Sequence, residues 1–129
     1  MTDDRLMNQT SIKDFTDLMV YRKAYEKSLE VHRRAQKYPK HEQYELAGQM
    51  RRASKGICAN IAEGFGKQNI SKQEFKRFLL MAMGSADEMR VWVRYSLDLG
   101  YIDESIWRDW DKSYSDIAKM LNGLHAKWG

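Results

Sequence analysis

The sequence predicts an all-α protein folded as an antiparallel up-down-up-down four-helix bundle. Its 129 residues are 43% hydrophobic and 31% charged, which is typical of one globular domain with a single core. One proline and eight glycines leave long stretches free of turn formers. Apolar residues recur at steps of three and four, which indicates amphipathic helices rather than strands.

The first predicted helix covers residues 14–38. It follows a polar stretch, residues 1–13, that we expect to be a flexible tail, so that the bundle domain covers residues 14–129. Pro39 ends this helix because proline lacks an N–H and clashes with the preceding turn. The residues expected to face the core are Leu18, Tyr21, Tyr25, Leu29, His32 and Ala35.

The second predicted helix covers residues 42–63. Gly64 and Gly66 are expected to end it, since a helix C-terminus often needs a left-handed residue. Gly56 is expected to lie level with Phe78 of the next helix, where a missing side chain makes room for a large ring. The expected core residues are Leu46, Met50, Ala53, Ile57 and Ile61.

The third and fourth helices are predicted over residues 71–99 and 103–128. Ser71 and Glu74 have the spacing of a capping box, Gly100 closes the third helix, and Asp103 is the expected N-cap of the fourth. Short connections between long helices favour antiparallel neighbours. The expected core residues are Phe75, Phe78, Ala82, Ser85, Met89, Trp92 and Ser96, followed by Ile106, Trp110, Ser113, Ile117, Leu121, Leu124 and Trp128.

The composition favours a cytoplasmic protein. The start of the chain is polar and includes Asp3 and Asp4, so it lacks the basic start and apolar run of a signal peptide, and no stretch approaches the roughly 18 apolar residues of a spanning helix. Cys58 is the only cysteine, which excludes an internal disulfide and is the usual pattern of a reducing compartment.

Sequence motifs for catalysis or cofactor binding are missing, so we expect no cofactor and no enzymatic activity. A dinuclear metal site in a bundle needs Glu-x-x-His pairs, and the sequence has none. Cys58 lies between apolar residues and is expected to be a small buried hydrophobe. The run from Gly64 to Lys67 lacks the full phosphate-loop pattern, and Asn60 and Glu63 before it are expected to hydrogen-bond across the corner between the helices.

Positive charge is concentrated in residues 20–60, which hold ten basic and four acidic residues, a net charge of +6. This concentration favours a polyanionic partner, and the alternatives are an ordinary solvated surface or ion pairs between subunits through Asp87 or Glu88. Arg51 and Lys55 are expected on the solvent side of the second helix. The candidate nucleic-acid-binding residues are Lys23, Lys27, Arg34, Lys37, Gln49, Arg51, Arg52 and Lys55.

Trp107 and Tyr114 lie off the main apolar stripe of the fourth helix. Because a bundle of this size has one core seam per helix, we expect these two aromatic side chains to face a partner subunit. The sequence therefore predicts self-association.

One set of residues, spread over most of the chain, is similar to a known protein family. Its members are Phe15, Leu18, Val20, Tyr21, Lys23, Ala24, Tyr44, Glu45, Leu46, Gln49, Arg51, Arg52, Ala53, Asn60, Ile61, Ala62, Glu63, Gly64, Glu74, Phe75, Gly84, Ser85, Leu99, Gly100 and Tyr101. In these residues the chain resembles a family of bacterial four-helix-bundle proteins encoded within intervening sequences of large-subunit ribosomal RNA genes. The similarity extends from about Phe15 to Trp128. Cys58 departs from the family's aliphatic residue and proline near this point, so a mid-helix kink is not implied.

The resemblance implies a homo-oligomer, with a ring of five favoured. It also implies a relation to the accessory variability proteins of diversity-generating retroelements, which are basic pentamers that associate with a reverse transcriptase and nucleic acid. The leading hypothesis is a non-enzymatic accessory protein that binds RNA or an RNA–DNA hybrid. The alternative is an oligomeric protein-interaction scaffold that binds no nucleic acid directly.

Overall fold

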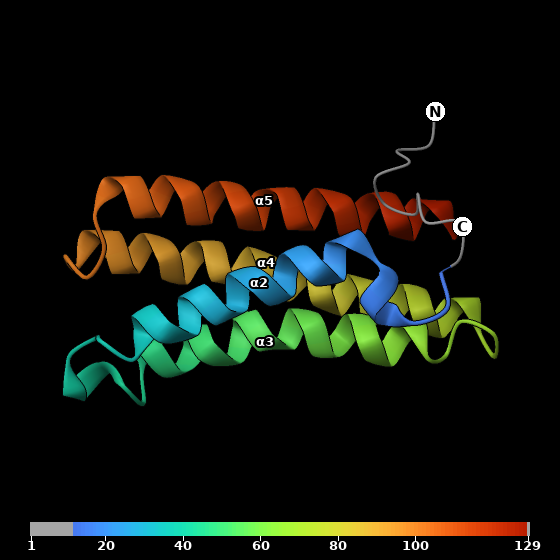
Figure 1. Cartoon of the computed structure of the whole chain (residues 1–129), viewed down its shortest axis with the longest axis horizontal. Coiled ribbons are helices and arrows are strands. Elements are labelled where there is room, and N and C mark those ends of the chain that lie inside the picture. Colours follow the sequence, from blue (N-terminus) through green and yellow to red (C-terminus); the bar gives the residue numbers. More distant parts are fainter. Residues whose placement is uncertain (1–11, 129) are drawn as a thin grey trace.

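The structure, a computed structural model, describes residues 12–128 and contains four α-helices and no strand in that range. This confirms the all-α class. The predicted flexible tail, residues 1–13, lies almost entirely outside the described residues. No helix within the described range combines the length and apolar character needed to cross a bilayer. The elements are η1 (Phe15–Asp17), α2 (Met19–Ala35), η2 (Lys40–Glu42), α3 (Leu46–Phe65), α4 (Lys72–Asp98) and α5 (Glu104–Lys127) (Figure 1).

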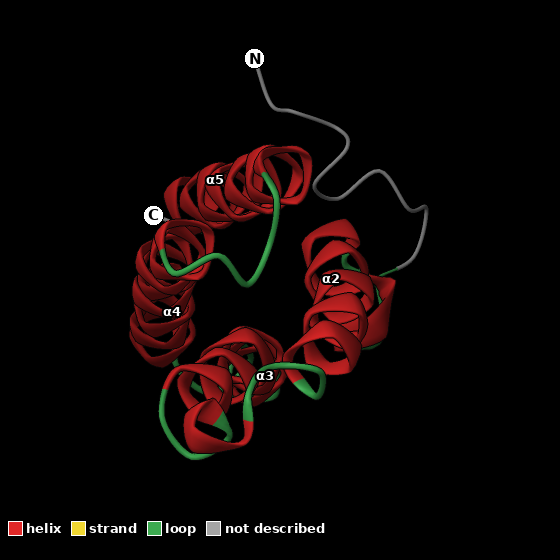
Figure 2. Ribbon diagram, turned by 90° about the vertical axis from the view of Figure 1, so that its left-hand side faces the viewer, coloured by secondary structure: helices red, strands yellow, loops and turns green. Residues whose placement is uncertain are grey.

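The four α-helices surround one hydrophobic core in the order α2, α3, α4, α5 (Figure 2). The pairs α3–α4 and α4–α5 pack along most of their length, whereas α2 and α5 share the shortest contact. The seam between α2 and α5 is therefore the most open of the four. The largest fully buried side chains are Trp110, Tyr114, Phe75, Leu18, Met50, Ile57, Ile61, Leu79, Met89, Ile117, Leu121 and Leu124.

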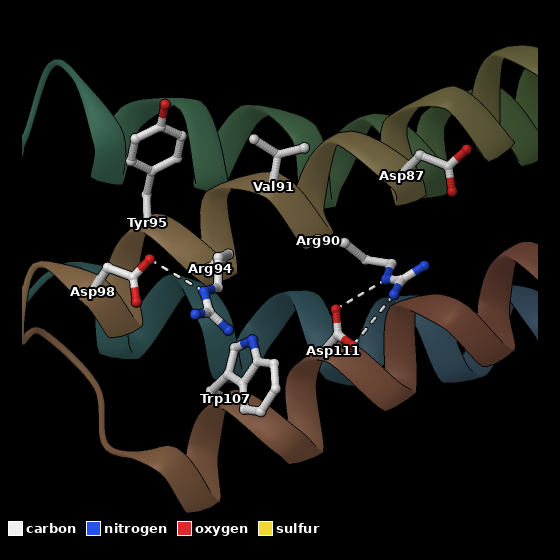
Figure 3. Close-up of a pocket in the computed structure, with 8 residues that line it drawn as sticks. All are labelled: Asp87, Arg90, Val91, Arg94, Tyr95, Asp98, Trp107 and Asp111. Atoms are coloured by element: carbon white, nitrogen blue, oxygen red, sulfur yellow. Dashed lines mark hydrogen bonds and ion pairs between the residues drawn. The ribbon is translucent and has the colours of Figure 1, made fainter.

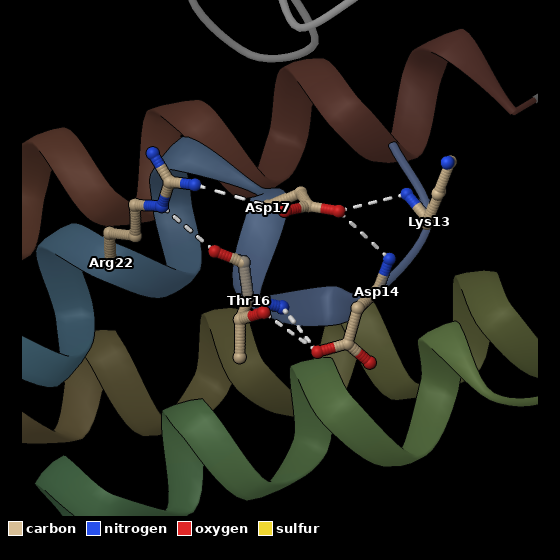
Figure 4. Close-up of polar contacts among 5 residues, drawn as sticks. All are labelled: Lys13, Asp14, Thr16, Asp17 and Arg22. Carbon is tan, nitrogen blue, oxygen red and sulfur yellow. Dashed lines mark hydrogen bonds and ion pairs between the residues drawn. The ribbon is translucent and has the colours of Figure 1, made fainter. Parts of the chain in front are cut away.

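The first predicted helix begins later than expected, because residues 14–17 form a separate 3-10 turn. The Asp14 carboxylate accepts hydrogen bonds from the Thr16 hydroxyl at 2.7 Å and the Thr16 amide at 3.4 Å. Asp17 accepts from the amides of Asp14 at 3.0 Å and Lys13 at 2.9 Å, which completes a capping box (Figure 4). The Arg22 side chain donates to the Thr16 carbonyl at 2.8 Å and ties this turn to α2.

The core-facing side of α2 also differs from the predicted one. Tyr25 is 47% exposed, and Tyr21 is half-buried and stacks on it with ring centroids 6.0 Å apart. The buried face is turned by about one residue, or roughly 100°. It is built largely from small side chains, which let α2 approach the bundle closely. The buried residues of α2 are Val20, Ala24, Ser28, Val31 and Ala35.

In the other helices most predicted core positions are buried, but the glycines act differently from the prediction. A Cβ on Gly64 would lie 2.7 Å from the Cβ of Phe78, whereas one on Gly56 would meet only the Ser85 hydroxyl at 3.5 Å. The close approach of α3 to α4 at Phe78 therefore depends on Gly64, not on Gly56. Gly64 lies inside α3, and Gly66 is the C-cap with an ordinary right-handed φ of −64°.

Three predicted helix boundaries are confirmed. The Ser71 hydroxyl accepts from the Glu74 amide at 3.2 Å, and the Asp103 carboxylate accepts from the Ile106 amide at 2.9 Å. The Glu74 carboxylate pairs with Arg77 rather than returning to Ser71, so only half of the predicted capping box forms. Gly100 follows α4 with a φ of +83°, which glycine adopts without steric cost.

Candidate nucleic-acid interface

The basic residues predicted on the first helix lie on the side of α2 that faces α5. Lys27 Nζ is 2.9 Å from Asp109 Oδ2 of α5 and 3.3 Å from Glu30 Oε1, and its side chain is only 15% exposed. Burial alone would lower the pKa of the Lys27 ammonium, but these two carboxylates hold that pKa above its ordinary value. Lys27 therefore joins α2 to α5 through its ion pair with Asp109 and is not available to bind a phosphate.

Lys23 also faces acidic residues of α5. The pKa of Asp116 lies below its ordinary value, first because Lys112 donates a hydrogen bond to it and further because Lys23 contributes positive charge nearby. In the N-terminal half of the predicted basic stripe, Lys27 is thus paired with α5, whereas Lys23 lies near Asp116 without forming an ion pair among residues 12–128.

The C-terminal half of α2 retains unpaired positive charge. Arg33 and Lys37 are exposed and Arg34 is half-buried. None of the three forms an ion pair with another residue in the range 12–128. Arg33 was not among the predicted binding residues, because helical spacing places it beside the stripe rather than within it. These three residues, Arg33, Arg34 and Lys37, are called the α2 basic cluster below.

The last carbonyls of α2 are satisfied by Gln43, which follows η2. Its side-chain amide donates to the carbonyl of Ala35 at 3.0 Å and to that of Tyr38 at 2.9 Å. Basic side chains near a helix C-terminus often serve as caps for these carbonyls. Because Gln43 already does so, the α2 basic cluster is free for other contacts.

Arg51 has a structural role that the sequence prediction missed. Its guanidinium donates to the Gln43 side-chain oxygen at 3.0 Å and to the Gln43 backbone carbonyl at 2.6 Å. Arg51 is half-buried, so its predicted place on the solvent side of α3 is wrong. Lys55, one turn later, is exposed as predicted. Arg51 therefore fixes the corner between α2 and α3 rather than presenting a free charge.

Gln49 and Arg52 lie on a different side of α3 from Arg51 and Lys55. Arg52 donates to the Gln49 side-chain oxygen at 3.0 Å, and both point away from α2. The eight predicted residues consequently do not form one continuous face. They divide among the α2–α5 seam, the α2–α3 side and the outer surface of α3.

His32 lies between α2 and α3 close to Lys55 and Arg51. Burial lowers the pKa of its imidazole, and the positive charges of Lys55, Arg51 and Arg33 lower it further. Its Nδ1 is buried without a hydrogen-bond partner in the described part of the chain. His32 is therefore expected to be neutral near pH 7, and so adds no charge to the basic residues around it.

Side chains that might carry catalysis are placed in structural positions. Cys58 is buried, and this burial raises the pKa of its thiol to about 11, which suppresses the reactive thiolate. The Asn60 amide donates to the Gly56 carbonyl within α3 at 2.9 Å, not across the corner as predicted. Within residues 12–128, no three His, Cys, Asp or Glu side chains are grouped as a metal site would require.

A second surface feature, between α4 and α5, was only partly foreseen. A groove of about 740 Å³ is bordered by Tyr95, Trp107 and two arginines, each paired with an aspartate (Figure 3). The Arg94 guanidinium lies 5.4 Å from the centre of the Trp107 ring. Trp107 is thus half-exposed here, but Tyr114 is fully buried, so the prediction that it faces a partner is wrong.

The signal for this surface was present in the sequence of α4. Five of its large apolar side chains are 44–54% exposed, and three of them recur at four-residue steps. This second stripe lies on the side opposite the core seam. Its members are Leu80, Met81, Val91, Tyr95 and Leu99, which are called the α4 apolar stripe below.

Comparisons with known proteins place the chain in a family. A search of curated proteins finds no match. The family model described as 23S rRNA-intervening sequence protein matches residues 16–123, which covers most of η1, all of α2, α3 and α4, and most of α5. The match includes the Gln43–Arg51 corner and the close contact at Gly64. The chain therefore belongs to the 23S rRNA-intervening sequence protein family.

Proposed function

We propose that the protein is a non-enzymatic, homo-oligomeric accessory protein that binds nucleic acid, with RNA or an RNA–DNA hybrid preferred over duplex DNA. The observation that carries the proposal is the α2 basic cluster, whose three cations have no acidic partner within residues 12–128. Arginine and lysine side chains of this kind contact phosphate oxygens in protein–nucleic acid complexes. The excess of positive charge in residues 20–60 supports the same reading.

The proposal includes an antiparallel up-down-up-down arrangement of the helices. Its support is the packing of each helix against the next and the brevity of the connections, since only residues 66–71 separate α3 from α4 and residues 99–103 separate α4 from α5. It also includes a relation to the accessory proteins of diversity-generating retroelements and an association with a reverse transcriptase. A reverse-transcriptase gene with a template repeat beside this gene would support that part.

The experiment that tests nucleic-acid binding is a salt titration. Structured RNA, an RNA–DNA hybrid and duplex DNA are titrated with the protein at several salt concentrations, with fluorescence anisotropy as the readout. Each neutralised phosphate releases a condensed counterion, so log affinity should fall linearly with log salt, with a slope of roughly −0.9 per contact on duplex DNA and roughly −0.7 on single-stranded segments. Absence of binding to all three at low salt would refute the proposal.

Self-association through the α4 apolar stripe is the second part that can be tested directly. Exposed apolar side chains in a continuous row are typical of protein interfaces. Light scattering should give a mass several times 15.2 kDa, with five copies favoured. Replacing Tyr95 and Leu99 by serine should lower this mass, while Tyr44→Ser, at a position 94% exposed outside the stripe, should not. A monomer at tens of micromolar would contradict the proposed oligomer.

The alternative function, a protein-interaction scaffold, is favoured by one observation. The α4–α5 groove combines an aromatic wall with arginine–aspartate pairs such as Arg90–Asp111, at 2.9 Å, and such a mixture is common at protein interfaces. If an oligomer forms but no nucleic acid binds at low salt, the scaffold is the better description.

A further inference from the structure

The α2 basic cluster borders two adjoining grooves between α2 and the beginning of α5. The first has a volume of about 460 Å³ and the second about 410 Å³, and Arg34 and Lys37 line both. Together they form one channel, called the α2–α5 channel below. Its combined size is within the range of small-ligand pockets, and it is open to solvent along its length.

Apart from the cations, the channel is lined by apolar and aromatic residues and, in the first groove, by Glu26 and Glu30. Ile106 and Trp110 of α5 line the first groove, and Pro39 and Tyr101 line the second. The polar tips of the two aromatic side chains are already bonded. Trp110 Nε1 donates to the Glu30 carboxylate, and the Tyr101 hydroxyl donates to Glu42 Oε2 at 2.8 Å. The Tyr101 ring is thereby held in place and presents carbon surface to the channel, whereas Trp110 is only 1% exposed and forms part of the channel floor.

The two ends of the channel differ in charge. Toward the start of α2, the first groove is lined by the carboxylates of Glu26 and Glu30, which repel a phosphate chain. Toward the end of α2, the three cations of the α2 basic cluster are free. A polyanion should therefore enter at the end of α2 and run along Arg34 and Lys37.

We infer that the α2–α5 channel binds a single strand of nucleic acid, with its phosphates on the α2 basic cluster and its bases against Ile106 and Tyr101. This inference rests on the proposed nucleic-acid-binding function and narrows its ligand to single-stranded RNA or DNA, which leaves an RNA–DNA hybrid, itself a duplex, outside the channel. Single-strand binding sites combine a positively charged groove with flat apolar side chains for the bases. A duplex about 20 Å wide has its bases stacked inside and can touch only the rim of such a channel.

The direct test compares ligands of equal length, of which the duplex carries about twice the phosphate charge of a single strand. Fluorescein-labelled oligo(U) and oligo(dT) of 15 nucleotides, the matching 15-base-pair duplex and an abasic deoxyribose-phosphate strand of the same length are titrated with the full chain. We expect either single strand to bind at least tenfold more tightly than the duplex and the abasic strand, because only the single strands offer free bases. The ratio of oligo(U) to oligo(dT) affinity reports the preferred sugar.

Variants locate the site. Arg34→Glu with Lys37→Glu should lower single-strand affinity at least tenfold and flatten the salt dependence by about one to two contacts. The matched control is Lys72→Glu with Lys127→Glu, which changes the net charge equally at exposed positions on α4 and α5. Lys72 begins α4 at the other end of the bundle from the end of α2 (Figure 1). The control should leave affinity within about twofold. Circular dichroism and light scattering on each variant show whether the fold and the oligomer persist.

Several results would overturn the inference. Equal losses in the reversal and control variants would show that total charge, not the channel, controls binding, and would leave the proposed function intact. If the duplex or the abasic strand binds as tightly as oligo(U) and oligo(dT), the channel does not bind free bases. This result too would leave the proposed function intact. Competition by poly-glutamate as strong as that by oligo(U) would point to an acidic protein as the occupant. Absence of any nucleic-acid binding would refute the proposed function together with the channel.

Discussion

The contact between α3 and α4 at Gly64 gives the sharpest test of the fold. In Gly64→Ala, the new Cβ would lie 2.7 Å from Phe78 Cβ, 3.1 Å from Phe75 Cδ1 and 3.3 Å from the Phe75 carbonyl oxygen. Two of these atoms are fixed to the backbone or part of it, so rotation of a side chain does not relieve the overlap. The two helices must separate, and overpacking of this kind costs about 1–3 kcal/mol.

The expected net effect follows from two opposing contributions. Alanine is favoured over glycine inside a helix by about 1 kcal/mol, and this gain is smaller near the end of α3, where Gly64 lies. We therefore expect Gly64→Ala to lower the free energy of unfolding by about 1–2 kcal/mol, which corresponds to a fall in Tm of roughly 3–10 °C for a chain of this size.

Two other glycines provide the controls. A Cβ on Gly84 would meet nothing within 4 Å, and one on Gly56 would meet only the Ser85 hydroxyl at 3.5 Å. Both replacements should therefore be neutral or stabilise the protein by up to about 1 kcal/mol. The measurement is urea unfolding followed by circular dichroism at one fixed protein concentration. If Gly64→Ala proves as stable as Gly84→Ala, the argument from close helix packing is wrong.

Three further predictions concern individual side chains. Arg51→Ala should lower the free energy of unfolding by about 1–3 kcal/mol because it breaks both hydrogen bonds to Gln43. The control Arg52→Ala, at an exposed position, should change this free energy by less than about 0.5 kcal/mol. Equal urea midpoints for the two variants would contradict the prediction. His32 has a lowered pKa in the folded state, so the unfolded state binds its proton more readily and stability should fall as the pH drops through and below about 6.5, the pKa of an unperturbed histidine; His32→Gln should weaken this dependence, and an unchanged slope would argue against it. Cys58, with its pKa raised to about 11, should react with Ellman's reagent at pH 8 far more slowly in the native protein than in guanidinium, and equal rates would show that the thiol is accessible.

The sequence predicts the positions of the helices well because the signals for them are local. The caps at Ser71 and Asp103 depend on residues within one turn, and the apolar spacing of α3 and α5 has one interpretation. The face of α2 was misjudged because Tyr21 and Tyr25 outweigh Ala24 in apolar character. Only the packed structure shows that small side chains bring this helix against its neighbours.

The candidate site was harder to predict because its meaning depends on partners distant in the sequence. Lys27 appears free until Asp109 of α5 is found beside it, 82 residues away. Arg51 appears exposed until the loop after α2 brings Gln43 within reach. Helical spacing alone therefore identified a basic region correctly but could not separate its structural cations from its free ones.

The short contact between α2 and α5 has a consequence for how the native molecule opens. Since α3, α4 and α5 remain packed against one another without it, α2 should be the first helix to detach in partial unfolding. Its amide protons should then exchange with deuterium faster than those of α4. The Lys27–Asp109 pair is one of the few ties across this opening, so Lys27→Met should speed exchange in α2 while leaving α4 unchanged. A nucleic-acid strand bound between α2 and α5 should slow exchange in α2. Hydrogen exchange would therefore report ligand binding at this site as well as the opening of α2.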